Sequence, residues 1–220
     1  MHRFSAPVCQ KEPLTRDDLT TVATSCPLPI SHDDLLFCAL LQMGFFGLNR
    51  LGELVWLDNS ALQSFSKVSW RLSAQLTPSS YSFQICRDKV DTHFEGTKVV
   101  IQHSPIEPDP FDTFACYLCS HDARFPLHSQ LWLRSDGSML VHSWFLCRLH
   151  AFFPHSIGGH SLRAGGATSL AAAEVPSSQI QAIGHWKSAA FEHYIRRHPT
   201  VLQALIFHGR GIHNSPFAVV

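Results

Sequence analysis

Long hydrophobic runs are missing from this 220-residue sequence. No stretch approaches the roughly 20 uninterrupted apolar residues that a bilayer-spanning helix needs, so no membrane partner is expected. The first residues, MHRFSAPVCQKEP, also lack the apolar core of a signal peptide. We therefore expect an intracellular protein, which would be nuclear in a eukaryote although no targeting signal is visible.

Charge is also scarce. Charged residues make up 15% of the chain, and 17 basic side chains balance 17 acidic ones. A net charge of zero counts against nucleic-acid binding, because nucleic-acid-binding proteins usually carry a basic excess that displaces counterions from phosphate. The distribution of charge matters more than its sum, however, and the 15 histidines add charge that depends on their surroundings.

A disulfide framework is not expected either, because the seven cysteines are odd in number and scattered, which fits a reducing compartment. What the sequence does have is apolar content, at 45%, which indicates a globular chain with a well-formed core. Residues 1–13 are polar, contain two prolines and are interpreted as a linker or truncated connection. We expect one domain over residues 14–208, followed by a C-terminal tail over 209–220.

Helical patterns dominate that domain. Thr15 followed by Asp18 resembles a capping box and predicts a helix through about Ser25. Ser31 caps a second helix that is apolar on most sides through Phe46, so this helix is expected to be central. Further helices are expected over residues 109–121, 142–153, 161–174, 176–184, 188–198 and 199–207.

A small sheet is expected between the helices. Residues 68–76 alternate strictly between apolar and polar, which predicts a half-buried strand. Two further β-rich runs, over 81–85 and 98–102, complete a three-stranded antiparallel sheet. An extended segment at 131–133 and a turn at 135–137 interrupt the later helices. The fold class is therefore α+β, mainly helical.

Three short motifs in the C-terminal third carry the most specific signal, namely HSLR (160–163), GHW (184–186) and YIRR (194–197). His160 and Arg163, three residues apart at a helix start, face the same side, so an imidazole and a guanidinium can converge on one phosphate. Ser188 can cap the following helix, and Tyr194 lies about two turns along it. If the chain reverses direction between the helix that ends near His185 and the helix that carries Tyr194, Tyr194 returns towards His185.

These motifs resemble those of the tyrosine recombinase, or phage-integrase-like, family. Its signature is an arginine, a lysine in a β-hairpin, His-x-x-Arg, a histidine or tryptophan, and a tyrosine. The segment GLNRLGEL (47–54) resembles the first arginine box, which makes Arg50 the first catalytic arginine and Glu53 its buttress. Lys89 falls where the hairpin lysine belongs, with Lys98 of the same sheet region as the alternative.

The resemblance extends from about Leu14 to Phe207. Residues 158–199 look more narrowly like recombinase domains abundant in fungal genomes, including crypton-like mobile elements. Family members usually place a helical N-terminal domain ahead of the catalytic one, whereas only about 13 residues precede the first helix here. Weak DNA binding, or a fragment or decayed copy, would be consistent with that difference.

The resemblance implies cleavage and rejoining of DNA strands through a 3′-phosphotyrosyl intermediate. The implied catalytic residues are Arg50, Lys89, His160, Arg163, His185 and Tyr194, with Glu53 and Trp186 in support. The two arginines would neutralise the phosphate oxygens, the histidines would donate hydrogen bonds and assist proton transfer, and the lysine would protonate the leaving oxygen. No metal or other cofactor is implied, and the partners are double-stranded DNA and further copies of the chain, as a tetramer.

Two other functions remain open. One is a catalytically silent DNA-binding remnant of a mobile-element recombinase, and the other is a type IB topoisomerase, which uses related groups on phosphate. The apolar segment 201–207 either completes the core or docks on a neighbouring subunit.

Several residues have ordinary structural interpretations. Tyr81 is expected in the sheet and Tyr117 on a helix, which leaves Tyr194 as the nucleophile. Cys116 and Cys119, with nearby histidines, suggest zinc at first glance, but core packing of their helix is favoured over a metal site. Two adjacent glycines at 165–166 indicate close helix packing behind the active site, because glycine costs a helix roughly 1 kcal/mol relative to alanine.

Overall fold

The structure, a computed structural model, describes residues 12–85 and 96–186. The helices are α1 (Arg16–Ser25), α2 (His32–Phe46), α3 (Leu51–Leu54), α4 (Pro110–Arg124), α5 (His142–Leu149), α6 (Gly159–Ala172) and α7 (Ser177–Ile183). The strands are β1 (Gln75–Leu76), β2 (Ser80–Ile85) and β3 (Thr97–Gln102), preceded by three 3-10 turns, η1 (Ser60–Leu62), η2 (Phe65–Lys67) and η3 (Arg71–Ser73). Lys89, Tyr194, the two expected helices over 188–207 and the tail lie outside the described residues.

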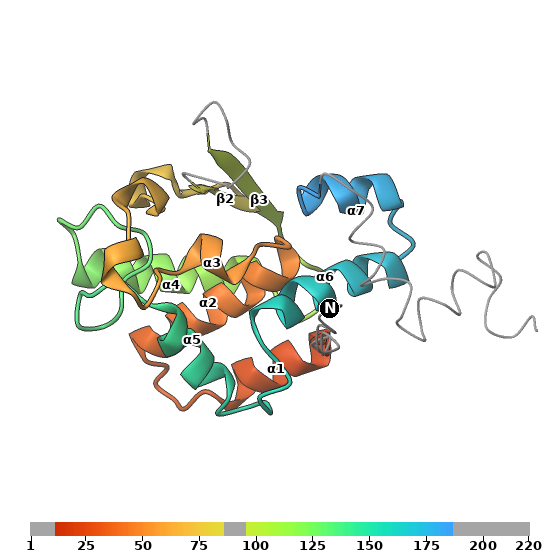
Figure 1. The fold of residues 1–220 in the computed structure, drawn as a ribbon, viewed down its shortest axis with the longest axis horizontal. Helices are drawn as coiled ribbons and strands as arrows, with labels where there is room; N and C mark the ends of the chain where they lie inside the picture. Colours follow the sequence, from red (N-terminus) through yellow and green to blue (C-terminus); the bar gives the residue numbers. More distant parts are fainter. Residues whose placement is uncertain (1–11, 86–95, 187–220) are drawn as a thin grey trace, which may run out of the picture.

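The elements form layers around α2 (Figure 1). The sheet packs on α4, α4 packs on α2, and α1 and α6 contact α2 from other sides. Both predicted N-terminal helices are confirmed, and each begins at the expected cap, where Thr15 and Ser31 make capping boxes with Asp18 and Asp34. None of the described helices is long and apolar enough to span a bilayer.

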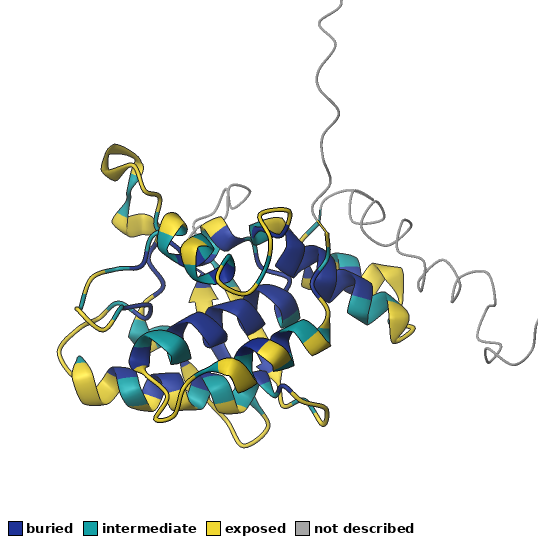
Figure 2. Cartoon of the chain, turned by 90° about the horizontal axis from the view of Figure 1, so that it is seen from below, coloured by how far each residue is buried: buried dark blue, intermediate teal, exposed yellow. Residues whose placement is uncertain are grey.

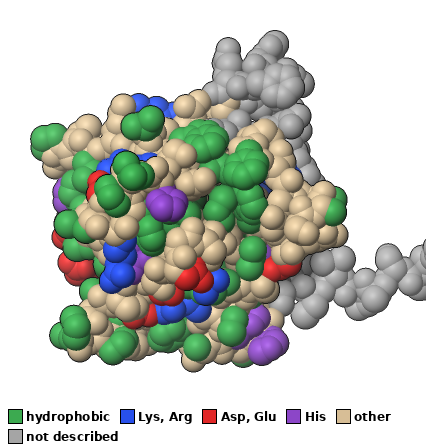
Figure 3. All heavy atoms as spheres, turned by 90° about the vertical axis from the view of Figure 1, so that its left-hand side faces the viewer, with side chains coloured by type: hydrophobic (Ala, Val, Ile, Leu, Met, Phe, Trp, Pro, Cys, Tyr) green, Lys and Arg blue, Asp and Glu red, His purple; other side chains and the backbone are tan. Residues whose placement is uncertain are grey.

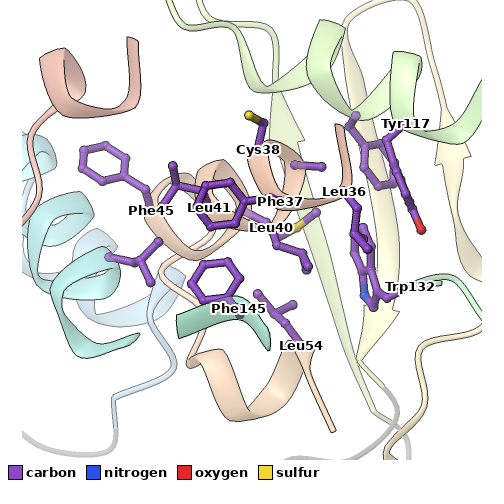
Figure 4. Close-up of a cluster of buried hydrophobic side chains, with 14 of the residues drawn as sticks. Leu36, Phe37, Cys38, Leu40, Leu41, Phe45, Leu54, Tyr117, Trp132 and Phe145 are labelled. Carbon is purple, nitrogen blue, oxygen red and sulfur yellow. The ribbon is translucent and has the colours of Figure 1, made fainter. Parts of the chain in front are cut away.

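The central position predicted for α2 is also confirmed. Eleven of its fifteen residues are buried, and the helix is dark along most of its length in Figure 2. Its side chains meet rings and aliphatic groups from α3, α4 and α5 (Figure 4), and Phe37 lies 5.2 Å from Phe145 between ring centroids. Fully burying one such side chain contributes about 1.5–3 kcal/mol, so the apolar residues on all sides of this helix form a large part of the core.

Helix α6 approaches its neighbours through its glycines. A Cβ atom built on Gly166 would lie 2.0 Å from the carbonyl oxygen of Phe45, and one on Gly165 would lie 2.1 Å from that of Leu14. The backbone of Leu14 also donates to the carbonyl of Ser161, at 3.1 Å. Close packing was expected at these two positions, and the backbone contacts confirm it.

The three-stranded antiparallel sheet is present in the order β1-β2-β3. Strands β2 and β3 pair from Ser80 with Gln102 to Ile85 with Thr97. Along β3 the side chains of Val99 and Ile101 are buried, and the residues between them face solvent. The last pair of the β2–β3 ladder is therefore Ile85 with Thr97.

The continuous strand predicted over 68–76 is wrong. Trp70 makes only an isolated bridge to Gln130, η3 follows, and β1 contains two residues. Residues 69–71 pair instead with the segment after α4, where the backbone N–H of Arg71 donates to the Ser129 carbonyl at 2.7 Å and that of Leu131 to the Ser69 carbonyl at 2.8 Å. The Arg71 guanidinium also binds Asp122 of α4 through two hydrogen bonds of 2.7 and 2.6 Å. Leu72, expected on the buried face of that strand, is 91% exposed in the local turn.

Two smaller expectations also differ. Helix α5 ends at Leu149 rather than at residue 153 and is followed by a turn just before Pro154. The helix does not reach residue 153 because the residue before a proline disfavours helical geometry. Helix α4 packs through Phe114 and neighbouring rings as expected, but Cys116 and Cys119 face solvent instead of the core. Neither cysteine belongs to a group with metal-ligand spacing among residues 12–85 and 96–186.

Candidate active site

Four segments that are distant in the sequence line one hollow of about 290 Å³, which is open to solvent. They are the α2–α3 junction, the hairpin ends of β2 and β3, α6, and the turn after α7. The lining residues are Leu48, Asn49, Arg50, Glu53, Ile85, Thr97, Arg163, Ile183, Gly184 and His185. Three of the six expected catalytic residues, Arg50, Arg163 and His185, therefore meet in this hollow.

Arg50 is fixed by the start of α3. It is the N-cap residue, and its backbone N–H donates to one oxygen of Glu53 at 2.8 Å. Its guanidinium binds the other oxygen at 2.7 Å, so one carboxylate holds both ends of the arginine. The Arg50 side chain is 41% exposed and that of Glu53 is 16% exposed, which leaves the cation accessible from the hollow.

Arg163 is held more tightly, because only 4% of it is exposed. Its Nη2 donates to the carbonyl of Gly184 at 2.5 Å, and its Cζ atom lies 4.0 Å from the centre of the Trp186 ring. Burying a cation is costly unless other groups compensate its charge. The carbonyl dipole and the negative face of the indole both contribute to that compensation.

The backbone of Trp186 is held in turn by Gln181. The Gln181 carbonyl accepts from the backbone N–H of Trp186 at 3.1 Å, and the Gln181 side-chain amide donates to the Trp186 carbonyl at 3.0 Å. Sequence reasoning found Trp186 but missed Gln181 and the Gly184 carbonyl. No sequence pattern indicates either contact, because both depend on how the chain turns after α7.

That turn has unusual backbone geometry at His185, whose φ is +52°. Residues other than glycine are uncommon in this left-handed region, and asparagine, aspartate and histidine adopt it more often than the rest. Gly184 has no room for a side chain, since an added Cβ would lie 1.8 Å from the Trp186 ring. The turn thus presents the exposed His185 imidazole to the hollow while its preceding carbonyl holds Arg163.

No protein-family model and no curated protein matches the chain by sequence. Solved structures do match. The XerA recombinase has a TM-score of 0.64 at 17% identity, over 96% of this chain and 67% of that one. The XerH site-specific recombinase, bound to its difH substrate before cleavage, has a TM-score of 0.61 at 13% identity, over 96% of this chain. The Tn1549 transposon integrase with circular intermediate DNA has a TM-score of 0.51 at 16% identity, over 93% of this chain and 68% of that one.

The chain has the tyrosine recombinase catalytic-domain fold. At these identities the likeness shows the fold alone, and the chain spans 58% of the XerH structure. The mainly helical α+β class with a three-stranded antiparallel sheet, expected from the sequence, is confirmed.

Within the recombinase fold, the other expected site residues stand as follows. His160 is exposed in the first turn of α6 and does not line the hollow. Lys98 is exposed on β3, and its side chain lies on the opposite face of the strand from Thr97. Thr97 lines the hollow and Lys98 does not. Lys89 is outside the described residues, and Ile85 and Thr97, the paired residues at the ends of β2 and β3, both line the hollow.

The two other tyrosines are unsuited to nucleophilic attack. Tyr81 and Tyr117 are at most 1% exposed, in the sheet and on α4 as expected. Burial raises the pKa of both phenols well above the ordinary value, which disfavours the phenolate. Tyr117 Oη is also committed as a donor to the Leu131 carbonyl, at 2.7 Å.

One group among the described residues has metal-ligand spacing, formed by His103, Asp109 and Asp112. Asp109 is the N-cap of α4 and accepts from the backbone N–H groups of Phe111 and Ser104 at 2.9 and 3.1 Å. Its carboxylate is thus already used as a helix cap.

Proposed function

We propose that the chain cleaves and rejoins DNA strands through a covalent bond between Tyr194 and a backbone phosphate. The observation that carries this proposal is the convergence of Arg50, Arg163 and His185 on one solvent-open hollow, within a fold shared with site-specific recombinases. A phosphodiester repels nucleophiles because it is an anion, so two fixed guanidiniums are suited to accept it.

The proposed reaction conserves bond energy. The Tyr194 Oη–phosphorus bond forms as the bond from phosphorus to the 5′ oxygen breaks, and Lys89 supplies the proton that this oxygen needs. Arg50 and Arg163 stabilise the charge on the non-bridging oxygens in the transition state. His185, which lines the hollow, assists removal of the phenol proton. A second 5′ hydroxyl then attacks the phosphotyrosyl bond and reseals the strand.

The proposed partners are double-stranded DNA and further copies of this chain, as a tetramer on the duplex. The structures of XerH and of the Tn1549 integrase with DNA support duplex binding by this fold. We extend the proposal to DNA integration by a fungal, crypton-like mobile element acting in the nucleus, because the sequence of residues 158–199 resembles such recombinases.

A nicked suicide substrate tests the reaction. The protein is incubated with a pool of random duplexes, each carrying a nick that lets the short 5′-hydroxyl strand diffuse away after cleavage. We expect a covalent protein–DNA adduct that survives SDS, and sequencing of the trapped DNA would report the preferred site. Arg163→Lys should lower the adduct yield about 10²- to 10³-fold, because lysine cannot reproduce the planar fork.

The matched control is Tyr194→Phe, which removes only the hydroxyl and should give no adduct. Adduct formation by Tyr194→Phe would disprove the assigned nucleophile. If the wild-type protein shifts duplexes on a gel but forms no adduct, the chain is a silent DNA-binding module. Relaxation of supercoiled plasmid without site preference would indicate a topoisomerase.

A further inference from the structure

Two cysteines are in contact where helix α1 meets the central helix α2. Cys26 is the C-cap of α1, Cys38 belongs to α2, and their Sγ atoms lie 3.7 Å apart. The Cys26 thiol also donates to the Val22 carbonyl at 3.4 Å, so its sulfur remains able to accept from the Cys38 thiol. The other described cysteines are exposed, namely Cys116, Cys119 and Cys147.

The two cysteines differ in their access to solvent. Cys38 is 3% exposed and belongs to the core, and Figure 4 shows its side chain directed away from Phe145. Cys26 is half-buried, and the connection that follows it, over 27–31, is exposed throughout, with Leu28 91% exposed. This connection lies at the lower left of Figure 1, and Figure 3, which faces that side, shows hydrophobic side chains scattered among both signs of charge. A small oxidant from solvent therefore meets Cys26 before Cys38.

The contact between the two sulfurs is close to what a disulfide needs. A disulfide holds its sulfurs about 2.05 Å apart, so from 3.7 Å they must approach by roughly 1.7 Å. Cys26 has already left the helical conformation, at φ −68° and ψ 132°, and an exposed connection follows it. Its backbone and side chain can therefore adjust, while Cys38 keeps its place in the core.

We propose that Cys26 and Cys38 are a redox-sensitive pair, which hydrogen peroxide converts to a disulfide that ties α1 to α2. The Cys26 sulfur attacks one peroxide oxygen, the O–O bond breaks, and Cys26 sulfenic acid and water form. The Cys38 sulfur then displaces the hydroxyl group, which leaves as a second water with the Cys38 proton as the S–S bond forms. Two electrons pass from the sulfurs to the peroxide. Disulfides in a reducing compartment are usually transient and redox-sensing, which agrees with the compartment expected from the cysteine pattern.

Burial determines how fast this pair reacts. It raises the pKa of both thiols, because the protein interior disfavours their charged forms. The thiolate is the form that attacks, so the pair reacts slowly at neutral pH and faster as the pH rises. The proposal does not depend on Tyr194 or on DNA cleavage.

Peptide mapping tests the proposal. The protein is treated with hydrogen peroxide, its free thiols are blocked with iodoacetamide, and it is digested without reduction. The tryptic peptide over 17–50 holds both cysteines, so the disulfide appears as a peptide that lacks two hydrogens and carries no alkyl group. Cleavage before Asp33 should leave the two halves joined until dithiothreitol is added. We expect this link in most molecules, and its formation should be about tenfold faster at pH 8 than at pH 7.

Thermal unfolding measures the consequence of the link. Closing the loop over 26–38 should raise the Tm by about 6–12 °C, and dithiothreitol should reverse this shift. Cys26→Ser should abolish both the link and the shift, with Cys38→Ala as a second variant. Cys147→Ser, which removes an exposed thiol from α5, is the matched control and should keep both. A Cys26 sulfinic acid in place of the link, a link that leaves the Tm unchanged, or a shift that persists in Cys26→Ser would overturn the proposal.

Discussion

The Arg163 guanidinium illustrates how single residues determine this site. The Gly184 carbonyl and the Trp186 ring fix its orientation, and Gln181 holds the Trp186 backbone. If Arg163 binds the reacting phosphate, its alignment matters more for the transition state than for initial DNA binding. Trp186 is therefore expected to affect the rate of cleavage through Arg163.

We predict that Trp186→Leu lowers the single-turnover cleavage rate about 3- to 30-fold, the equivalent of a cation–π contact of about 0.5–2 kcal/mol. Duplex affinity should change less than the rate. Cleavage of the trapped DNA site and fluorescence anisotropy measure the two quantities. Trp70→Leu, at a partly exposed indole outside the hollow, is the control, and an equal effect of both variants would contradict the positioning role.

Asp34 couples stability to pH. Burial alone would raise the pKa of its carboxyl, but hydrogen bonds from Ser31 and Arg148 outweigh burial and hold this pKa below its usual value. The folded pKa is thus lower than the unfolded one. The stabilisation is complete above the unfolded pKa of about 3.9 and is lost as the pH falls through the folded value.

We predict that Asp34→Asn lowers the free energy of unfolding by about 1–3 kcal/mol at pH 7, with a smaller difference at pH 3. Urea unfolding at several pH values measures this. Asp17→Asn, an exposed acid in the first turn of α1, should change stability by less than about 1 kcal/mol. A constant difference between Asp34→Asn and the wild type at all pH values would refute the linkage.

At the scale of elements, α6 depends on the absence of side chains where it meets α2. Gly166→Ala would bring a methyl group against the Phe45 carbonyl, which is backbone and cannot rotate away. We predict a loss of at least about 1–3 kcal/mol in unfolding free energy, since overpacking costs this much. Gly52→Ala on α3, with nothing within 4 Å of the new Cβ, should be neutral or slightly stabilising.

The elements that the sequence predicted correctly are those determined by local chemistry. Helices α1 and α2 begin at capping boxes, and β3 alternates between buried and exposed residues, so neighbouring residues were sufficient to find them. The 68–76 segment was mispredicted because the backbone of residues 69–71 pairs with residues 129–131, which are distant in the sequence. Gln181 escaped notice for a similar reason, since its contact with Trp186 exists only after the chain turns.

For the whole molecule, the balance of 17 basic and 17 acidic residues limits electrostatic attraction to DNA. Affinity for DNA would then depend on counterions that local groups of cations, such as Arg50 and Arg163, displace from the phosphates. We predict that duplex affinity falls less than about 100-fold between 50 and 200 mM salt, as for about three phosphate contacts. Anisotropy with a labelled 30-base-pair duplex measures the slope, and a fall of 10³-fold or more would indicate extensive contact with the DNA backbone.

The left-handed turn at His185 also constrains how the protein can be engineered. Glycine at this position would remove a backbone cost of about 1–3 kcal/mol, and it would simultaneously delete the imidazole. A laboratory screen that rewards heat resistance alone would therefore enrich such exchanges, and, under the proposed function, the most stable variants would be the ones least able to act on a phosphate.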